Sequence, residues 1–542
     1  MKKINPLLIL SASIFMTLSV SGCGNNKPKD GKKVLQIAVV AKGYGSDFVN
    51  DLITEFNKRS ETTRAELAYK GPNINYQDTR LQLPNNQIDL FFTVKNTVFK
   101  TQSTNSMKHW ADLTDVYDSP LEGYEEADGT KTNREYIDQS YVNALTFTDG
   151  KIYAVPYTSG VVGLLYNKSK WDSTNTNLRN KGKEELTLPK TTNEMFELFE
   201  RIKTSDVKNA SGGAYAFSYS GINSYMHFMF NSLWPQYLGK EAANNFFEGK
   251  DANGIYTADI YKTDARKYSY NVVRNMILQQ NGYVASTDIG TTYDLEQLSF
   301  LRGNSMFSCN GDWMEREAST QFNPGEADVE LIRTPILSEI VNSPAIAADF
   351  TGNADRKETK LQNVVAFIDE NYINDDKTPV EADATSLSIS LNTLSFLYEA
   401  RLARHNLADF MAVVPENSNE VSEAKDFLKF MLSKDGQEIM MNASYGCGTP
   451  MTVDYKQMEY YKLGTYYSKS RLDLIKKSIS YGNYMNTPME FLAGLEPCKD
   501  LEIAAAFGGK TPSTAEELMM KEFNEYDVQW ETKMKLAGVS NE

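Results

Sequence analysis

The chain has few of the residues that build metal centres and disulfide frameworks. It contains 4 Cys and 3 His among 542 residues, and the histidines lie far apart in the sequence. No pair of these side chains has the spacing of a zinc site. We therefore expect no metal and no cofactor. Apart from Cys23, the cysteines are Cys309, Cys447 and Cys498, whose irregular distances leave open whether two of them form one bridge or all are free thiols.

Catalytic signatures are missing as well. The sequence has no Gly-rich loop ending in Lys-Ser or Lys-Thr, no His pair at metal spacing and no Gly-x-Ser-x-Gly elbow. Glu315 and Glu317 could be imagined as a glycosidase pair, but residues two apart on one helix point to different faces. We expect a protein that is not an enzyme, with an exported carbohydrate-active enzyme as an alternative.

Long apolar runs are absent after residue 23. The single long run covers residues 4–20, follows two lysines and precedes Ser-Gly-Cys23. It is shorter than the ~20 residues of a bilayer span, and its layout is that of an export signal. The cysteine after Ser-Gly resembles the bacterial lipobox, in which the thiol is lipidated. We expect a signal peptide at residues 1–22, a lipidated Cys23 with a flexible tether to residue 33, and a location at the extracellular face of the bacterial cytoplasmic membrane.

Positive charge is in short supply. There are 56 Lys and Arg against 71 Asp and Glu, a net charge of −15, and removing the signal takes away two lysines and no acid. This balance argues against nucleic acid and anionic membrane surfaces as partners, so we expect membrane contact through the lipid anchor alone. The length favours more than one core-bearing domain.

Short apolar runs alternate with helix signals along the rest of the chain. Residues 34–40 are typical of a buried strand, and residues 46–47 can cap the helix that follows. The spacing of a capping box occurs at residues 191–194 and again at residues 513–517. This alternation predicts an α/β layer architecture with a parallel sheet.

Four segments, in this order, resemble the extracellular solute-binding proteins of bacterial ABC importers, in particular the carbohydrate-binding family of maltose- and oligosaccharide-binding lipoproteins. The resemblance spans about residues 34–455, with residues 337–409 longer than the family norm. The segments are DGKIYAVPY at 149–157 with GLLYNK at 163–168, LPKTTNE at 188–194, FLRGNSM at 300–306 with NGDW at 310–313, and FMAVVP at 410–415 with GTP at 448–450.

This resemblance implies two α/β lobes joined by crossing hinge strands, with a ligand cleft between them, as in type II periplasmic binding proteins. One crossing would run from residue 156 to 166 and a later one from residue 410 to 414. The expected boundaries are residues 34–156 and about 315–410 for the first lobe, and residues 157–314 and about 411–542 for the second lobe and the C-terminal helices.

A carbohydrate site needs aromatic plates for the sugar faces and planar polar groups for the hydroxyls. Trp313 matches the position of a stacking Trp in maltose-type relatives, and Asp312 beside it could accept hydrogen bonds from hydroxyls; the alternative is that Trp313 fills core. Further candidates for contacting the ligand are Tyr44, Tyr157, Tyr225, Asp89, Ser159 and Asn310, with Thr93 and Trp234. The alternative for each of them is a role in packing or in hydrogen bonding to the backbone.

We therefore predict a monomeric, membrane-tethered lipoprotein that captures a carbohydrate, expected to be an oligosaccharide, by lobe closure. It would deliver this cargo to the permease subunits of an ABC transporter. A peptide or polyamine is the alternative solute; an acidic chain would suit a polyamine, although its acids are spread along the sequence. A surface adhesin or sensor subunit with the same fold is a further alternative.

Overall fold

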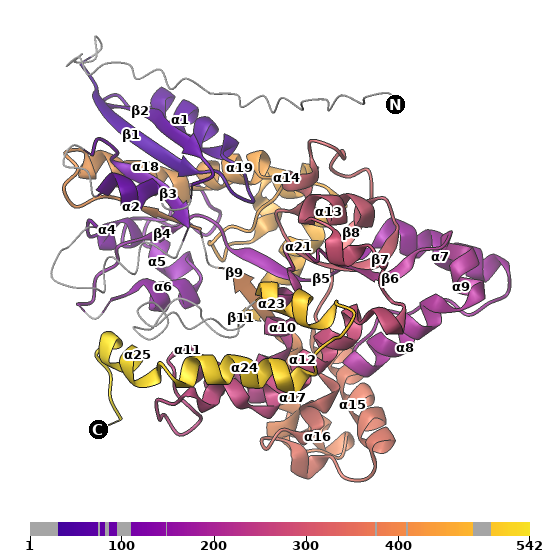
Figure 1. The fold of residues 1–542 in the computed structure, drawn as a ribbon. Helices are drawn as coiled ribbons and strands as arrows, with labels where there is room; N and C mark the ends of the chain where they lie inside the picture. The colour runs from indigo at the N-terminus through magenta and orange to yellow at the C-terminus, as the bar shows by residue number, and fades with distance from the viewer. Residues whose placement is uncertain are drawn as a thin grey trace, which may run out of the picture.

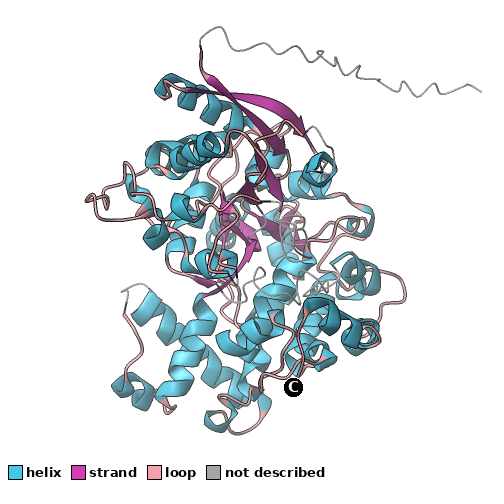
Figure 2. Ribbon diagram, turned by 90° about the vertical axis from the view of Figure 1, so that its left-hand side faces the viewer, coloured by secondary structure: helices cyan, strands magenta, loops and turns pink. Residues whose placement is uncertain are grey.

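The computed structural model describes residues 31–73, 76–81, 86–94, 110–147, 149–373, 377–407, 410–480 and 500–541. The predicted signal peptide, Cys23 and most of the tether lie outside these residues, as do His109 and Cys498. Within them, no helix has both the length and the apolar character required to cross a bilayer. Two sheets flanked by helices organise the chain (Figures 1 and 2).

The first sheet has the strand order β2-β1-β3-β10-β4. The predicted strand at residues 34–40 is its β1, which runs parallel to β2 and β3, whereas β10 is antiparallel to β3 and β4. The sheet is therefore mixed rather than wholly parallel. Its strands are β1 (Lys33–Val40), β2 (Thr63–Gly71), β3 (Leu90–Val94), β4 (Val155–Pro156) and β10 (Phe410–Val413).

The second sheet has the order β11-β9-β5-β7-β6, with β8 paired to β5. Its central strand β5 is buried along its whole length, as expected of an apolar strand covered on both faces. The strands are β5 (Gly160–Asn167), β6 (Tyr215–Ser218), β7 (Ser305–Gly311), β8 (Val329–Leu331), β9 (Ala403–Leu407) and β11 (Ile479–Ser480).

The chain crosses between the sheets at the two predicted places. β4 belongs to the first sheet and β5, which begins four residues later, belongs to the second. The return crossing leads from β9 in the second sheet to β10 in the first. Both predicted hinge segments are confirmed.

The first lobe consists of the first sheet and the helices packed on it. Helix α1 packs against α18 and α19, and Phe56 of α1 touches Phe427 and Phe430 of α18. The helices of this core are α1 (Asp47–Arg59), α2 (Tyr76–Leu81), α4 (Thr114–Tyr117), α5 (Asn133–Tyr136), α6 (Gln139–Leu145), α14 (Met314–Ala318), α18 (Val421–Leu432), α19 (Lys434–Ala443), α20 (Glu459–Leu463) and α21 (Tyr466–Lys476).

The second lobe surrounds the second sheet. Both predicted capping boxes are present, with Thr191 and Glu194 opening α8 and Thr514 and Glu517 opening α24. Its helices are α7 (Lys168–Asn180), α8 (Thr192–Lys203), α9 (Ser205–Ser211), α10 (Met226–Leu238), α11 (Lys240–Phe247), α12 (Asp264–Ile277), α23 (Asp500–Phe507), α24 (Ala515–Asp527) and α25 (Trp530–Ala537). α13 (Tyr293–Leu301) packs on β7 of this sheet, and its Phe300 and Leu301 join the core that contains the first sheet.

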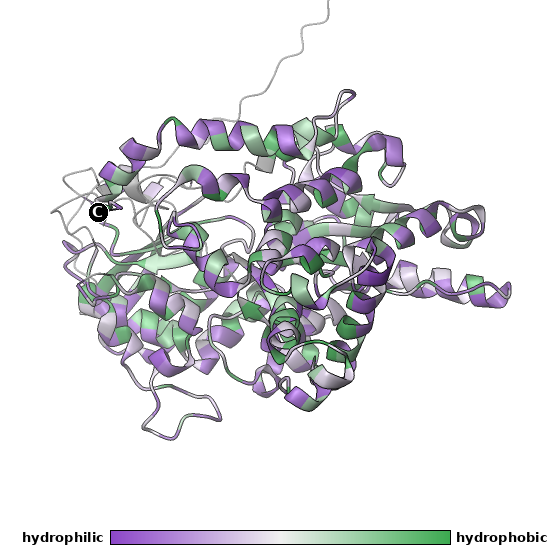
Figure 3. Cartoon of the chain, turned by 90° about the horizontal axis from the view of Figure 1, so that it is seen from below, coloured by the Kyte–Doolittle hydropathy of each residue, from purple (hydrophilic) through white to green (hydrophobic). Residues whose placement is uncertain are grey.

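Residues 336–402 form a helical insertion with a hydrophobic core of its own. It contains α15 (Ala354–Ile368), α16 (Glu381–Ser386) and α17 (Leu391–Leu402), which lie together at the lower edge of the view in Figure 1. Seen from below in Figure 3, the outer helices carry much hydrophilic surface, and the apolar residues gather toward the interior.

The lobe boundaries differ from the prediction in the second half of the chain. β8 and β9 join the second sheet, so residues 315–410 do not belong to the first lobe as a block. Residues 410–443, which form β10, α18 and α19, pack with the first sheet, whereas α21 packs on β8 of the second sheet and residues 503–530 lie in the core of the second lobe. The prediction was wrong here because the apolar runs of crossing strands look alike, and long-range pairing decides which sheet each one joins.

Candidate functional site

The loop after β1 meets the end of β7 at the junction of the two sheets. The Tyr44 hydroxyl donates a 2.6 Å hydrogen bond to Asp312 Oδ1, and both residues are only 1% exposed. Gly43 and Gly45 adopt positive φ on either side of Tyr44, which turns this loop back toward β7. Two predicted ligand residues, 268 positions apart in sequence, are thus in direct contact.

Asp312 is also held by the segment that follows α19. The Gly448 N–H donates 2.9 Å to Asp312 Oδ2, and Arg471 of α21 donates to the Asp312 backbone carbonyl and lies 4.0 Å from its carboxylate. Burial raises the pKa of Asp312, and Arg471 and the Tyr44 hydrogen bond oppose that rise. Protein donors thus engage both oxygens of the Asp312 carboxylate. Asp312 links the two lobes, and it also lies beside Trp313, the predicted aromatic plate.

Trp313 lies in an aromatic cluster drawn from both lobes. Its ring meets Tyr44 edge-on at 6.1 Å, Phe228 at 5.7 Å and Tyr225 at 6.4 Å between centroids. Phe410 packs 4.9 Å from Tyr44 on the same side. Trp313 is 6% exposed, so it is covered by other rings in this conformation.

Tyr225 reaches this cluster through an unusual backbone. Ser224 and Tyr225 have φ of 66° and 62°, the left-handed region that side-chain-bearing residues seldom adopt. This pair precedes α10 and brings the Tyr225 ring to Trp313 and to Phe228, the latter at 5.2 Å. Strained backbone of this kind gathers at functional sites, and it supports a ligand role for the cluster.

Two predicted residues lie elsewhere. Tyr157 packs in the core of the first lobe, stacked on Phe48 at 5.4 Å and separated from Tyr44 by the ring of Phe410. Asp89 precedes β3 and accepts hydrogen bonds from the Gln36 N–H (2.8 Å) and the Ser418 hydroxyl (2.7 Å). It sits at the end of the first sheet opposite to Tyr44. The prediction that Asp89 joins the ligand site is corrected: it ties β1 to the segment before α18.

Three small polar side chains each have one buried atom without a hydrogen-bond partner. Ser159 Oγ, Asn310 Nδ2 and Thr93 Oγ1 have no such partner among the described residues, although these residues are at most 2% exposed. Unsatisfied buried polar atoms are costly and uncommon in proteins, so each of these atoms is a candidate contact for a bound group. Ser159 and Asn310 thus each keep a polar atom that could form the predicted hydrogen bond to a ligand.

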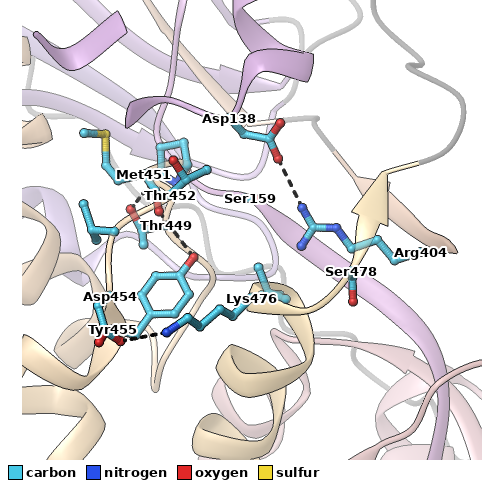
Figure 4. Close-up of a pocket in the computed structure, with 13 residues that line it drawn as sticks. Asp138, Ser159, Arg404, Thr449, Met451, Thr452, Asp454, Tyr455, Lys476 and Ser478 are labelled. Atoms are coloured by element: carbon cyan, nitrogen blue, oxygen red, sulfur yellow. Dashed lines mark hydrogen bonds and ion pairs between the residues drawn. The ribbon is translucent and has the colours of Figure 1, made fainter. Parts of the chain in front are cut away.

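A pocket of about 220 Å³ opens at the hinge, between the two lobes (Figure 4). Arg404 of β9 points across it and donates 3.2 Å to Asp138, the N-cap residue of α6. Arg404 Nε and Nη1 are buried and have no partner among the residues that the structure describes. The other lining residues are Ser159, Thr449, Pro450, Met451, Thr452, Val453, Asp454, Tyr455, Ile475, Lys476 and Ser478.

Sequence reasoning missed Arg404 and Arg471. Neither residue lies in a recognisable motif. The one local sign of a buried charge is that each arginine lies within or next to an apolar segment. Among the described residues, no group of three His, Cys, Asp or Glu side chains could hold a metal ion. Cys309 and Cys447 are both buried and no disulfide joins them, while Trp234 packs against Phe246 and Phe247 in the second lobe.

Comparisons with known proteins agree with this architecture. A sequence model of the family described as bacterial extracellular solute-binding protein matches residues 51–462. The multiple sugar-binding protein of Streptococcus mutans is 27% identical over 165 residues, which is 30% of this chain and about a third (34%) of that relative's length.

Several solved structures share the fold at low sequence identity. The ABC substrate-binding protein Lmo0181 of Listeria monocytogenes, in complex with cycloalternan, has a TM-score of 0.54 at 13% identity, covering 94% of this chain and 100% of that one. Maltose-bound MalE3 of T. maritima has a TM-score of 0.55 at 13% identity, covering 91% and 99%. The binding protein MsmE of Bacillus subtilis, in an open conformation, has a TM-score of 0.53 at 15% identity, covering 93% and 99%.

Proposed function

Because this chain belongs to the bacterial extracellular solute-binding protein family, we propose that it captures a carbohydrate between its two lobes. The observation that carries the proposal is the aromatic cluster around Trp313, to which both lobes contribute rings. Sugars present weakly apolar C–H faces and a rim of hydroxyls, and such a cluster offers rings for the faces and hydrogen-bonding groups for the rim.

In this proposal Trp313 and Tyr225 supply the plates. Ser159, Asn310 and Arg404 would supply hydrogen bonds to hydroxyls, since each has a buried polar atom without a partner among the described residues. Tyr44 and Asp312 would act through closure, because their bond links a loop of the first lobe to a strand of the second. Binding and release involve no covalent step.

The similarity to a multiple sugar-binding protein and to a protein in complex with cycloalternan supports a carbohydrate, and an oligosaccharide in particular. We further propose that the protein works as a monomer, held at the outer face of the membrane by a lipid on Cys23, and hands its cargo to an ABC permease. Cys23 lies outside the described residues, so the anchor rests on the Ser-Gly-Cys sequence and the signal before it. The lipid tether would keep the receptor near its transporter. A protein that only binds its cargo needs this proximity to deliver it.

The test is calorimetric titration of the signal-free protein with neutral mono- and oligosaccharides, including maltose, raffinose and chitin and xylan fragments, with a dipeptide and spermidine in parallel. We expect saturable binding of at least one sugar with a Kd in the micromolar range or below. Binding of the peptide or the polyamine with no heat from any sugar would replace the carbohydrate proposal. Release of a shortened sugar during the titration, detected by chromatography, would favour an enzyme.

A further inference from the structure

A second and larger pocket lies where four parts of the chain meet. It has a volume of about 670 Å³, within the usual range for small-molecule sites. Its walls come from the segment before α8, from β8 and the residues after it, from the helical insertion, and from α20–α21. None of its lining residues is shared with the hinge pocket of Figure 4.

The charges lining this pocket are unusual for so acidic a chain. Five cationic side chains face three carboxylates, and protein donors already engage each carboxylate. Glu330 accepts hydrogen bonds from the hydroxyls of Tyr166 (2.9 Å) and Tyr466 (2.7 Å). Asp473 accepts from Tyr461 at 2.8 Å. The cationic residues are Lys190, Arg333, Arg401, Lys469 and Lys477.

Asp369 lies near both Arg333 and Arg401 but forms its ion pair with Arg401. Arg401 engages both oxygens of Asp369, because its Nε and Nη2 donate hydrogen bonds to them at 2.8 and 2.9 Å. Arg333 donates 3.0 Å to the backbone carbonyl of Lys477, and no carboxylate within the described part of the chain pairs with it. Burial, with the positive charge of Arg401 nearby, lowers the pKa of Arg333 to about 10, against the negative charge of Asp369.

We propose that this pocket binds a small oxyanion, a carboxylate or a phosphate carried by a soluble molecule, and that Arg333 is its main ligand. The guanidinium fork matches the paired oxygens of either group, and a partly buried cation that no carboxylate of the described residues pairs with gains from such a partner. Lys469 adds positive charge, since within the described residues its ammonium donates to the Lys462 carbonyl alone, at 3.1 Å. Tyr461 and Tyr466 provide ring surface for the body of the ligand.

Three titrations test this: sodium phosphate, sodium glucuronate and neutral glucose, each at constant ionic strength, followed by calorimetry and by Tm. Phosphate also stabilises proteins in general, because it is excluded from their surface. Saturable binding and a comparison with a matched variant are therefore needed to distinguish a specific site from this effect. The variants are Arg333→Gln, Arg333→Lys, and Arg302→Gln as a control that removes an exposed arginine outside the pocket.

We expect saturable one-to-one binding of phosphate or glucuronate, unchanged in Arg302→Gln and weaker by about tenfold or more in Arg333→Gln, since a charged hydrogen-bonded pair is lost. Arg333→Lys should fall between the two and also serves if Arg333→Gln does not fold. Binding of phosphate alone identifies a phosphate group and binding of glucuronate alone a carboxylate. No saturable binding of either anion, glucuronate binding no tighter than glucose with no phosphate binding, or equal affinity in the wild type and both Arg333 variants would overturn the proposal. The titrations with neutral sugars test the proposed function, and their outcome does not depend on whether the second pocket binds an anion.

Discussion

Tyr44 and Asp312 form a 2.6 Å hydrogen bond that joins the loop after β1 of the first sheet to the end of β7 of the second. The same carboxylate accepts from the Gly448 N–H, and the Asp312 backbone carbonyl accepts from Arg471. One buried residue thus connects four distant parts of the chain. A motion that separates the loop after β1 from the end of β7 has to break the Tyr44 bond, which makes this bond a probe of closure.

Tyr44→Phe should lower the free energy of unfolding by about 1.5–3 kcal/mol, because a buried carboxylate loses a hydrogen bond. If closure is the binding motion, sugar affinity should also fall by about tenfold or more. Denaturant unfolding and calorimetry measure the two effects. Tyr153→Phe is the control, since it removes a hydroxyl that donates to the exposed Asp149, and it should have little effect on affinity. Unchanged stability and affinity in Tyr44→Phe would mean that the bond contributes nothing.

Trp313→Ala should reduce sugar affinity by a factor of about 10 to 100, by analogy with the roughly 1–3 kcal/mol of a base stacked on an aromatic ring. In Trp313→Phe the ligand-induced change in tryptophan fluorescence should also disappear. Trp234→Phe is the matched control: Trp234 is buried in the second lobe and donates 3.0 Å to Asn231 Oδ1, so it should cost stability but not affinity. Equal affinity in Trp313→Ala and the wild type, with folding intact, would assign Trp313 to the core.

Local signals in the sequence predicted local structure well. The apolar run at β1 and the two capping boxes were readable because neighbouring residues determine them. The crossings at β4–β5 and β9–β10 followed from the family resemblance. The lobe assignment of residues 315–480 failed because strand partners hundreds of residues apart decide it.

The candidate site shows the same division. Trp313 was predicted from the family resemblance, with Asp312 beside it, and Tyr44 from its loop after the first strand; Tyr44 contacts both. Asp89 also adjoins a strand but precedes it, so it lies at the wrong edge of the sheet. Arg404 and Arg471 acquire their significance from burial and from partners on distant segments, which a single sequence does not encode in any motif.

Arg404→Met should weaken sugar binding by about tenfold or more while changing the free energy of unfolding by less than about 1.5 kcal/mol. The reason is that two of its buried nitrogens have no partner in the described part of the protein, so replacing them by apolar atoms costs the folded state little. Calorimetry and denaturant unfolding measure both quantities. Lys476→Met is the matched control, a half-exposed cation of the same pocket paired with Asp454 at 3.4 Å. Equal losses of affinity in the two variants would show that Arg404 acts only through its charge.

Stability should fall as the pH rises from 4.5 to 8, and Glu296 should cause part of this fall. Glu296 is fully buried; burial raises its pKa to about 7, although hydroxyls of Ser218 (2.6 Å) and Ser308 (2.7 Å) donate to it and oppose the rise. Asp288, raised to about 7 by burial and by the charge of Glu296, adds to the effect. Between pH 4.5 and 7 the folded state keeps a proton that the unfolded chain has released, so the unfolding free energy decreases with pH.

Glu296→Gln should remove this contribution, because the amide keeps the shape and hydrogen-bonding capacity of the neutral acid. Relative to the wild type it should be nearly neutral at pH 4.5 and more stable by roughly 3 kcal/mol at pH 8, because burial raises the pKa of Glu296 to about 7. Denaturant unfolding at several pH values gives the slope for each protein. Glu197→Gln, which removes an exposed carboxyl on α8, should keep the wild-type slope. A Glu296→Gln variant whose stability parallels the wild type at every pH would mean that Glu296 is ionised in the folded protein at low pH, with Ser218 and Ser308 stabilising the charge.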